Sequence, residues 1–309
     1  MSLLITGAAG FIGSNLLHNL IDLYDSEIVV IDYLTDISNP DNIPDFINLY
    51  PIDISDRYVV DKIFKKHRPE YIFHLAAESH VDNSIKDCLP FIDTNIKGTV
   101  NLLNSSLEYG VKKFMHISTD EVYGALSSEY ENSFTETTSY NPLNPYSASK
   151  AASDHFVSAY VNTYNLPAVI TNCSNNYGPR QSVDKLIPKT ITNLLKGQKV
   201  PVYGQGRQIR DWLYVQDHCE ALIEVWKNGK VGDSYNIGGG VEMNNLALVS
   251  KIISLMGKDH SDIKFVDDRP GHDFRYSIDC KKIENDLGWK SRYDFEEGLL
   301  ETIKWYESN

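Results

Sequence analysis

Short apolar runs alternate with helical spacings of apolar side chains along the first half of the chain. The apolar runs lie at residues 2–6, 27–32, 71–76 and 114–118. The helical spacings lie at residues 11–24, 59–66 and 93–109. Runs that are apolar throughout indicate strands buried on both faces, and such strands separated by helices predict a parallel sheet covered on both sides. Right-handed crossovers then give a doubly wound α/β fold.

The pattern changes after about residue 175, where glycine and proline become frequent. Helical spacing continues over residues 187–195, 217–227 and 295–306, and a short strand pattern at 234–237 runs into three glycines. We therefore expect one domain over residues 1–174 and a smaller, mixed α/β domain over mainly 175–309. The strand near 234–237 is a candidate to return to the main sheet.

Charge and composition narrow the classes of function. The 309 residues are 42% hydrophobic, as in a globular protein, and carry a formal net charge of −13. Such a surface repels nucleic acid and anionic membranes. No targeting pattern and no run of about 18 apolar residues is visible. Four widely spaced cysteines suggest free thiols in a reducing compartment, so we expect a cytosolic protein.

Three glycines follow the first predicted strand and open the first predicted helix. Gly7, Gly10 and Gly13 form a GxxGxxG pattern, in which the backbone can turn tightly and approach a pyrophosphate at the helix N-terminus. The alternative is a glycine turn without a ligand, but the strand before it and the helix after it favour a dinucleotide site in a Rossmann-type domain.

Asp32 ends the second predicted strand, where a carboxylate accepts hydrogen bonds from the adenosine ribose and repels a 2′-phosphate. No arginine follows it closely, so the sequence favours NAD over NADP. Asp53, in the segment 51–56 (PIDISD), sits where a third strand would end, near the expected adenine. For each residue the alternative is an ordinary acidic side chain at a strand end.

Tyr146 and Lys150 form a YxxxK pattern, which places both side chains on one face of a helix. A nearby ammonium and a cationic nicotinamide would lower the pKa of the tyrosine from its usual value of about 10. Tyr146 could then take a proton from a substrate hydroxyl. The pattern is common by chance and gains weight because it follows the glycine motif.

The segment 116–124 (HISTDEVYG) follows another predicted parallel strand, at the end where such folds bind ligands. Thr119 offers a hydroxyl beside Tyr146, and the adjacent carboxyl groups of Asp120 and Glu121 can divide acid and base roles if their environments differ. The alternative is a polar loop whose threonine and aspartate cap the next turn.

These motifs resemble those of the extended short-chain dehydrogenases/reductases, and specifically of the dTDP-glucose 4,6-dehydratases. The resemblance runs from the first strand to the last helix. It is carried by residues 76–82 (AAESHVD), 94–99 (TNIKGT), 119–124 (TDEVYG), 146–155 (YSASKAASDH), 172–179 (NCSNNYGP), 210–215 (RDWLYV) and 269–273 (RPGHD). Thr119, Asp120 and Glu121 are the specific part, since related epimerases and decarboxylases lack the Asp-Glu pair. Plant UDP-glucose dehydratases share it.

The resemblance implies a complete reaction. Tyr146 takes the C4 hydroxyl proton as hydride passes from C4 to NAD. Glu121 removes the C5 proton, which the new ketone has acidified, while Asp120 protonates the leaving C6 hydroxyl. Hydride then returns to C6 and C5 is reprotonated, so the product is a 4-keto-6-deoxy sugar nucleotide and NAD ends unchanged.

The resemblance also implies the binding residues. The dinucleotide would contact Phe11, Ile12, Asp32, Asp53, Ile54, Ala77, Thr94, Tyr146, Lys150 and Asn176. The sugar nucleotide would contact Ser79, Thr119, Asn175, Lys185, Leu186, Pro201, Tyr203, Arg210, Asn245, Arg269 and His272. Arg210 and Arg269 suit a diphosphate because guanidinium binds its oxygens in a bidentate fork. The alternative for both arginines is a surface salt bridge with Asp211 or Asp268.

Other readings stay open. A sugar-nucleotide 4-epimerase or decarboxylase uses the same scaffold, and a non-catalytic NAD-binding regulator would need only the glycines and Asp32. The bases of dTDP and UDP differ by one methyl group, and the sequence does not decide between these nucleotides. The hexose is taken as glucose by resemblance alone, and the pathway, such as one toward rhamnose, is not encoded. The histidines show no metal-binding spacing, so we expect no metal, and His74 is expected to be a hydrogen-bonded sheet residue. The family's dimers imply a homodimer through helices at 93–109 and 148–164.

Overall fold

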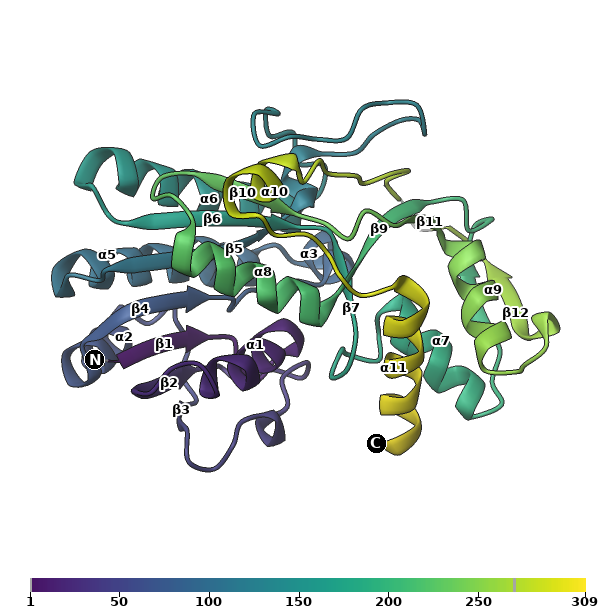
Figure 1. Cartoon of the computed structure of the whole chain (residues 1–309), viewed down its shortest axis with the longest axis horizontal. Coiled ribbons are helices and arrows are strands. Elements are labelled where there is room, and N and C mark those ends of the chain that lie inside the picture. The colour runs from purple at the N-terminus through teal and green to yellow at the C-terminus, as the bar shows by residue number, and fades with distance from the viewer. Residues whose placement is uncertain (1, 269–270) are drawn as a thin grey trace.

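The computed structural model describes residues 2–268 and 271–309. Its main sheet has seven strands in the order β10-β6-β5-β4-β1-β2-β3, and every neighbouring pair is parallel (Figure 1). The strands are β1 (Ser2–Thr6), β2 (Glu27–Ile31), β3 (Asn48–Tyr50), β4 (Pro69–His74), β5 (Lys113–Thr119), β6 (Ala168–Cys173) and β10 (Ser234–Ile237). This arrangement confirms the predicted doubly wound α/β fold.

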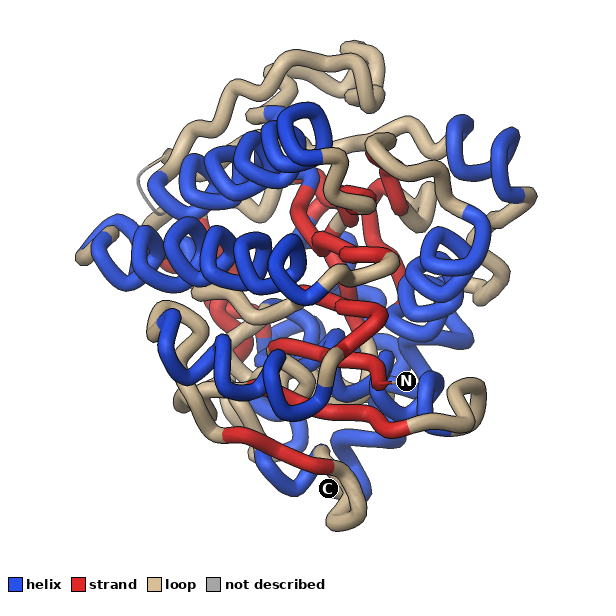
Figure 2. The backbone as a smooth tube through the Cα atoms, turned by 90° about the vertical axis from the view of Figure 1, so that its left-hand side faces the viewer, coloured by secondary structure: helices blue, strands red, loops and turns tan. Residues whose placement is uncertain are grey.

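Helices cover both faces of the main sheet, and Figure 2 shows the strands lying between them. One face packs against α1 (Phe11–Ile21), α8 (Val215–Asn228) and α10 (Lys281–Leu287). The other packs against α2 (Arg57–His67), α5 (Thr99–Tyr109) and α6 (Pro145–Tyr164). Each face has its own apolar core, which explains why the strands are apolar at nearly every position.

Side-chain caps set where two of these helices begin. The Asp56 carboxylate accepts from the backbone N–H groups of Tyr58 and Val59 at the start of α2. Asn144 forms a capping box with Ser147, and a proline occupies the first turn, so α6 starts three residues earlier than the predicted 148. Tyr146 therefore lies in the first turn of α6, in the same helix as Lys150.

The helix predicted over 93–109 is not continuous. The short α4 (Leu89–Phe91) leads into a π-helical stretch, η2 (Ile92–Gly98), before α5 begins. The wider turn directs the side chain of Asn95 inward, where it is 2% exposed. It accepts from the Glu78 N–H at 2.8 Å and donates to the Glu78 carbonyl at 3.0 Å and to Ser149 Oγ at 2.8 Å. Hydrophobic spacing alone does not reveal such a turn, and π-turns are frequent at functional sites.

The second part of the chain has a separate core beside the main sheet (Figure 1). A three-stranded sheet orders β11-β9-β7 and a further pair joins β12 to β8. The strands are β7 (Asn175–Tyr177), β8 (Val200–Tyr203), β9 (Ile209–Tyr214), β11 (Glu242–Asn244) and β12 (Ile263–Val266). The helices are α7 (Leu186–Leu195), α9 (Asn245–Leu255) and α11 (Phe295–Ser308). The strand at 234–237 pairs with β6 in the main sheet, while the division at residue 174 stays a prediction.

Short elements complete the described structure. They are α3 (Val81–Lys86) and the 3₁₀ turns η1 (Pro40–Asn42), η3 (Asp120–Tyr123) and η4 (His260–Asp262). None of the helices within residues 2–268 and 271–309 is both long enough and apolar enough to cross a membrane.

Candidate active site

A cavity opens at the carboxyl ends of the parallel strands, where doubly wound folds bind ligands. Its wall comes from the turns that follow β1, β2, β4, β5 and β6 and from the first turns of α6. All residues predicted to bind the dinucleotide or to act in catalysis line this one cavity. Of the residues predicted to bind the sugar nucleotide, those that line it are Ser79, Thr119, Asn175 and Lys185.

The glycine turn fits a pyrophosphate. Gly7 has φ +75°, and a Cβ on Gly13 would lie 2.1 Å from the Gly7 carbonyl oxygen, so both positions need glycine for the backbone to pack. A Cβ on Gly10 would meet no protein atom closer than 3.4 Å and faces the cavity. Helix α1 has no side-chain cap, so its first N–H groups remain available for an anion.

Asp32 is buried after β2 and supports the loop around the cavity. Its Oδ2 accepts from the Ala9 N–H at 2.8 Å, and its Oδ1 accepts from the Leu34 N–H at 2.9 Å and Ser38 Oγ at 3.0 Å. Because a carboxylate has about four acceptor sites, it can still accept a ribose hydroxyl. The third strand, β3, stops at Tyr50, so Asp53 lies three residues beyond the strand end and not, as we predicted, at it. These features fit a dinucleotide with a free 2′-hydroxyl.

Tyr146 and Lys150 lie one turn apart on α6, and both are buried. Lys150 Nζ donates to the Ile117 carbonyl at 2.8 Å. Burial, and then the charge of Glu121, raise the pKa of Tyr146 well above its usual value, whereas the Thr119 hydroxyl lowers it. In the protein without dinucleotide, burial is the largest influence on this pKa. We predicted that a nearby ammonium and the cationic nicotinamide together lower it, and this stays a prediction.

Thr119, Asp120 and Glu121 follow β5 directly. Thr119 caps η3 by accepting from the Glu121 N–H at 3.3 Å, so the capping role and a place in the cavity occur together. Asp120 is 3% exposed, and its Oδ2 has no hydrogen-bond partner among the described residues. Burial, followed by the charges of Glu121 and Asp211, raises the pKa of Asp120 well above its usual range. Asp120 is therefore suited to hold a proton, as a general acid must.

Arg210 is buried, which rules out the alternative of a surface salt bridge. Its guanidinium lies 4.3 Å from the ring centre of Tyr276 and donates to the carbonyl oxygens of Ile209 and Asp273 at 2.7 and 3.0 Å. Its positive charge lowers the pKa of Asp120, so it lies within electrostatic reach of the acid. Arg210 is outside the cavity wall itself.

The remaining residues predicted for the sugar nucleotide are spread over the second part of the chain. The Tyr203 and His272 rings lie 6.3 Å apart, and the Asn245 N–H donates to the Gln208 carbonyl, close to Arg210. Leu186 packs against the core of the second part, and Pro201 pairs with Lys264 between β8 and β12. None of these lines the cavity in this structure. Arg269 lies outside the described residues.

Sequence reasoning missed several residues that shape the site. Ser118, Cys173, Ser174, Gln181 and Ser182 also line the cavity. Asn95 holds the loop at Glu78 against Ser149, whose hydroxyl donates to the Tyr146 carbonyl at 2.7 Å. In the sequence, Asn95 is visible as a polar residue within a predicted helix. The direction of its side chain cannot be inferred until the π-turn is known.

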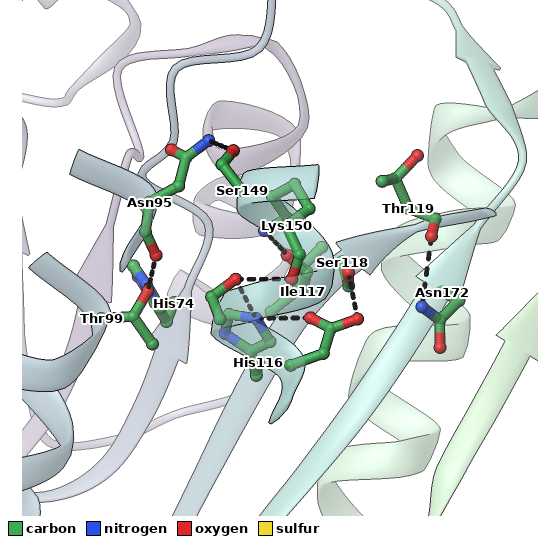
Figure 3. A network of polar contacts seen from close by, with 12 residues as sticks. His74, Asn95, Thr99, His116, Ile117, Ser118, Thr119, Ser149, Lys150 and Asn172 are labelled. Carbon is green, nitrogen blue, oxygen red and sulfur yellow. Dashed lines mark hydrogen bonds and ion pairs between the residues drawn. The ribbon is translucent and has the colours of Figure 1, made fainter. Parts of the chain in front are cut away.

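Two further predictions concern His74 and the absence of a metal site. His74 is buried in β4, with Nδ1 2.8 Å from Thr6 Oγ1. Its Nε2 lies 2.9 Å from Thr99 Oγ1 (Figure 3), so it is the hydrogen-bonded sheet residue that we expected. Within residues 2–268 and 271–309, no group of three or more potential ligands is placed to hold a metal ion.

A glycine turn, a buried tyrosine–lysine pair and a cavity at the sheet's carboxyl edge together define an extended short-chain dehydrogenase/reductase. The family model of GDP-mannose 4,6 dehydratase matches residues 4–302. The dTDP-glucose 4,6-dehydratase of Neisseria gonorrhoeae is 46% identical over 100% of this chain and 96% of the relative. That of Haemophilus influenzae is 47% identical over 100% and 98%. The chain belongs to the nucleotide-sugar 4,6-dehydratase family, among the dTDP-glucose 4,6-dehydratases.

Solved structures agree with this assignment. DesIV, a dTDP-glucose 4,6-dehydratase from Streptomyces venezuelae solved with NAD and TYD bound, is 41% identical with a TM-score of 0.95, covering 100% of this chain and 98% of DesIV. A UDP-glucose 4-epimerase from Thermotoga maritima also reaches a TM-score of 0.95, covering 100% and 99%, but is only 30% identical. The fold is thus common to dehydratases and 4-epimerases, so the residues in the site must determine which reaction takes place.

Proposed function

We propose that this protein is an NAD-dependent dTDP-glucose 4,6-dehydratase, which converts its substrate to the 4-keto-6-deoxy sugar nucleotide and water. The observation that carries the proposal is Asp120. A buried carboxyl group with a raised pKa lies beside a second carboxylate, Glu121, in the cavity that also holds Tyr146. Elimination of water needs an acid and a base at neighbouring carbons, whereas epimerisation at C4 needs neither of these carboxyl groups.

The residues at the glycine turn and along the adenosine side fit NAD. Gly7, Gly10 and Gly13 would hold the pyrophosphate, and Asp32 and Asp53 the adenosine. Ile54, Ala77, Thr94, Lys150 and Asn176 would line the remainder. When bound, NAD supplies reversible oxidation at C4, reduction at C6 and a positive charge beside Tyr146.

The chain's own groups move the protons. Tyr146, with the Thr119 hydroxyl beside it, takes the proton of the C4 hydroxyl. Once C4 is a carbonyl, the C5 proton is acidified and Glu121 removes it. Asp120 gives its proton to the C6 hydroxyl, so the C6–O bond breaks and water leaves. A hydroxide without that proton would be a poor leaving group, which explains why a protonated carboxyl group is needed here.

The sugar nucleotide is proposed to bind between the two parts of the chain. Ser79, Asn175 and Lys185 would hold the sugar at the cavity. Arg210 and Arg269 would hold the diphosphate, with Tyr203, Asn245 and His272 around the nucleoside and Leu186 and Pro201 nearby. The names of the similar proteins favour thymidine over uridine as the nucleoside of the substrate. The pathway that uses the product is left open.

Purified protein incubated separately with dTDP-glucose and UDP-glucose tests the proposal. Mass spectrometry should show loss of one water from dTDP-glucose, with no net accumulation of reduced dinucleotide, and a slower reaction with UDP-glucose. Isomerised sugar without loss of mass would establish an epimerase instead. Binding of NAD without any change in either sugar would favour a non-catalytic regulator.

We also propose that the protein is a cytosolic homodimer. Helices α5 and α6 pack side by side on one face of the sheet and expose large apolar side chains, among them Leu107, Phe156 and Tyr164. Burial of these side chains against a second copy would remove apolar surface from water. The four cysteines are free thiols, which suits a reducing compartment.

A further inference from the structure

One turn beyond Lys150 on α6, the carboxyl group of Asp154 is buried against β5 and is 1% exposed. Its Oδ2 accepts hydrogen bonds from Ser118 Oγ at 2.8 Å and from the Tyr140 hydroxyl at 3.0 Å. Its Oδ1 lies 3.0 Å from His116 Nε2. Figure 3 shows His116 and Ser118 in one network of polar contacts with Lys150. The reaction described above makes no use of Asp154.

The donors around Asp154 indicate a carboxylate. Both hydroxyl groups donate to it, and a third donor is available on His116, which matches a group that only accepts. His116 does not neutralise this charge, because burial and the nearby Lys150 lower its pKa. His74, whose ring lies 5.3 Å from that of His116, is also neutral, since burial lowers its pKa well below the usual value.

Lys150 precedes Asp154 by one turn on the same face of α6, and its Nζ donates to the Ile117 carbonyl, between the two β5 residues that contact Asp154. It is therefore the cation placed to balance this buried carboxylate. The titratable groups around it come from four elements, namely Tyr146 and Asp154 on α6, His116 on β5, His74 on β4 and Cys173 on β6. Burial lowers the pKa of Lys150, and the charge of Asp154 is the largest influence that raises it. A buried ammonium with one carbonyl partner, Ile117, is costly unless a nearby anion compensates it.

We propose that Asp154 is a positioning residue that supplies the buried counter-charge for Lys150, keeping it an ammonium held at the dinucleotide cavity without itself touching substrate or dinucleotide. Its carboxylate is fixed by Ser118, Tyr140 and His116, so the counter-charge has a defined place. The inference deepens the proposed function, because Lys150 serves Tyr146 and the dinucleotide only while it carries its charge.

The first test is the pH profile of dehydration. Asp154→Asn keeps the shape of the side chain and removes its charge, so Lys150 loses its proton at lower pH. The alkaline limb of kcat/KM should move to lower pH by roughly one unit. Tyr140→Phe is the matched control, because it removes one hydrogen bond to the same carboxylate and leaves the charge. The alkaline limb of its kcat/KM profile should lie at the same pH as that of the parent. An unshifted limb in folded Asp154→Asn protein overturns the proposal.

The second test needs no turnover and therefore separates this inference from the proposed function. Chemical unfolding is measured for the parent, Asp154→Asn, Lys150→Met and the double variant. Each single change leaves one buried charge uncompensated, so the double variant should be more stable than Lys150→Met. If Asp154→Asn alone does not fold, recovery of folded protein in the double variant is the expected result. Additive losses, or no recovery, overturn the proposal even if dehydration is observed.

Discussion

Asn144 joins the helix that carries Tyr146 to the carboxylate of Glu121. Its Oδ1 accepts from the Ser147 N–H at 2.9 Å and caps α6, while its Nδ2 donates to Glu121 Oε2 at 3.4 Å. The Asn144 amide thus holds Glu121, the proposed base for the C5 proton, next to the helix that carries Tyr146, the proposed base for the C4 hydroxyl. The two functions of this amide can be separated by substitution.

Asn144→Asp retains an oxygen for the helix cap and loses the donor to Glu121. We expect thermal stability close to that of the parent and a lower kcat, because two carboxylates then face each other. Asn144→Ala removes the cap as well and should cost about 1 kcal/mol of stability. Equal activity of Asn144→Asp and the parent would show that this contact does not orient Glu121.

Asp120→Asn removes the proton that the leaving hydroxyl needs and keeps the size of the side chain. Dehydration should slow by roughly 10²–10⁴-fold, the usual contribution of a general acid. Proton exchange at C5 with deuterated water should continue, because Glu121 is intact. Glu121→Gln is the matched comparison and should lose both C5 exchange and dehydration. If Asp120→Asn also loses C5 exchange while NAD binding and C4 oxidation persist, the assigned division of roles is wrong.

The buried Asp120 carboxyl group should also make stability depend on pH. Its pKa is raised in the folded protein, so the folded state binds this proton more tightly than the unfolded chain. The resulting stability is fully present below the unfolded pKa, about 4, and is lost as pH rises through the folded pKa. The slope from this group is at most about 1.4 kcal/mol per pH unit. Denaturant unfolding across pH should show a shallower decline for Asp120→Asn, and parallel curves would contradict this.

Gly10→Ala should lower NAD affinity without unfolding the protein. The added methyl group has room within the chain but projects into the cavity where the pyrophosphate is proposed to lie. We expect a tenfold or greater rise in the Kd for NAD by calorimetry, about 1.4 kcal/mol, with a melting temperature near that of the parent. Gly13→Ala is the contrasting variant and should destabilise the fold, because its Cβ would meet the Gly7 carbonyl at 2.1 Å. Unchanged NAD affinity in Gly10→Ala would show that the pyrophosphate does not bind at this turn.

Phe156→Asp should convert the proposed dimer to monomer. Phe156 is 42% exposed on α6, and a charge there would be costly to bury against a second copy. Sedimentation velocity at micromolar concentration is the measurement. Tyr130→Asp is the matched control, since Tyr130 is 94% exposed on a loop and belongs to neither α5 nor α6. A parent protein that sediments only as monomer refutes the dimer outright.

The sequence by itself determined the class of fold and the chemistry available. Continuous apolar runs such as 28–31 (IVVI) indicate strands buried between two layers of helices, and a glycine triplet after the first strand marks the phosphate turn. These features are local, because spacing and residue type set them before the chain folds. The trio at 119–121 likewise names an acid and a base without saying which residue keeps its proton.

Only the tertiary structure decided how those groups behave. The pKa of Asp120 is raised because folding buries its carboxyl group near Glu121 and Asp211, which lies more than ninety positions further along the chain. Asn95 faces inward because a π-turn replaces the regular helix, and Asp154 lies near Lys150 within a network that three separate segments supply. Burial and charge proximity are properties of the packed chain, so a sequence pattern can identify the groups but cannot fix their protonation.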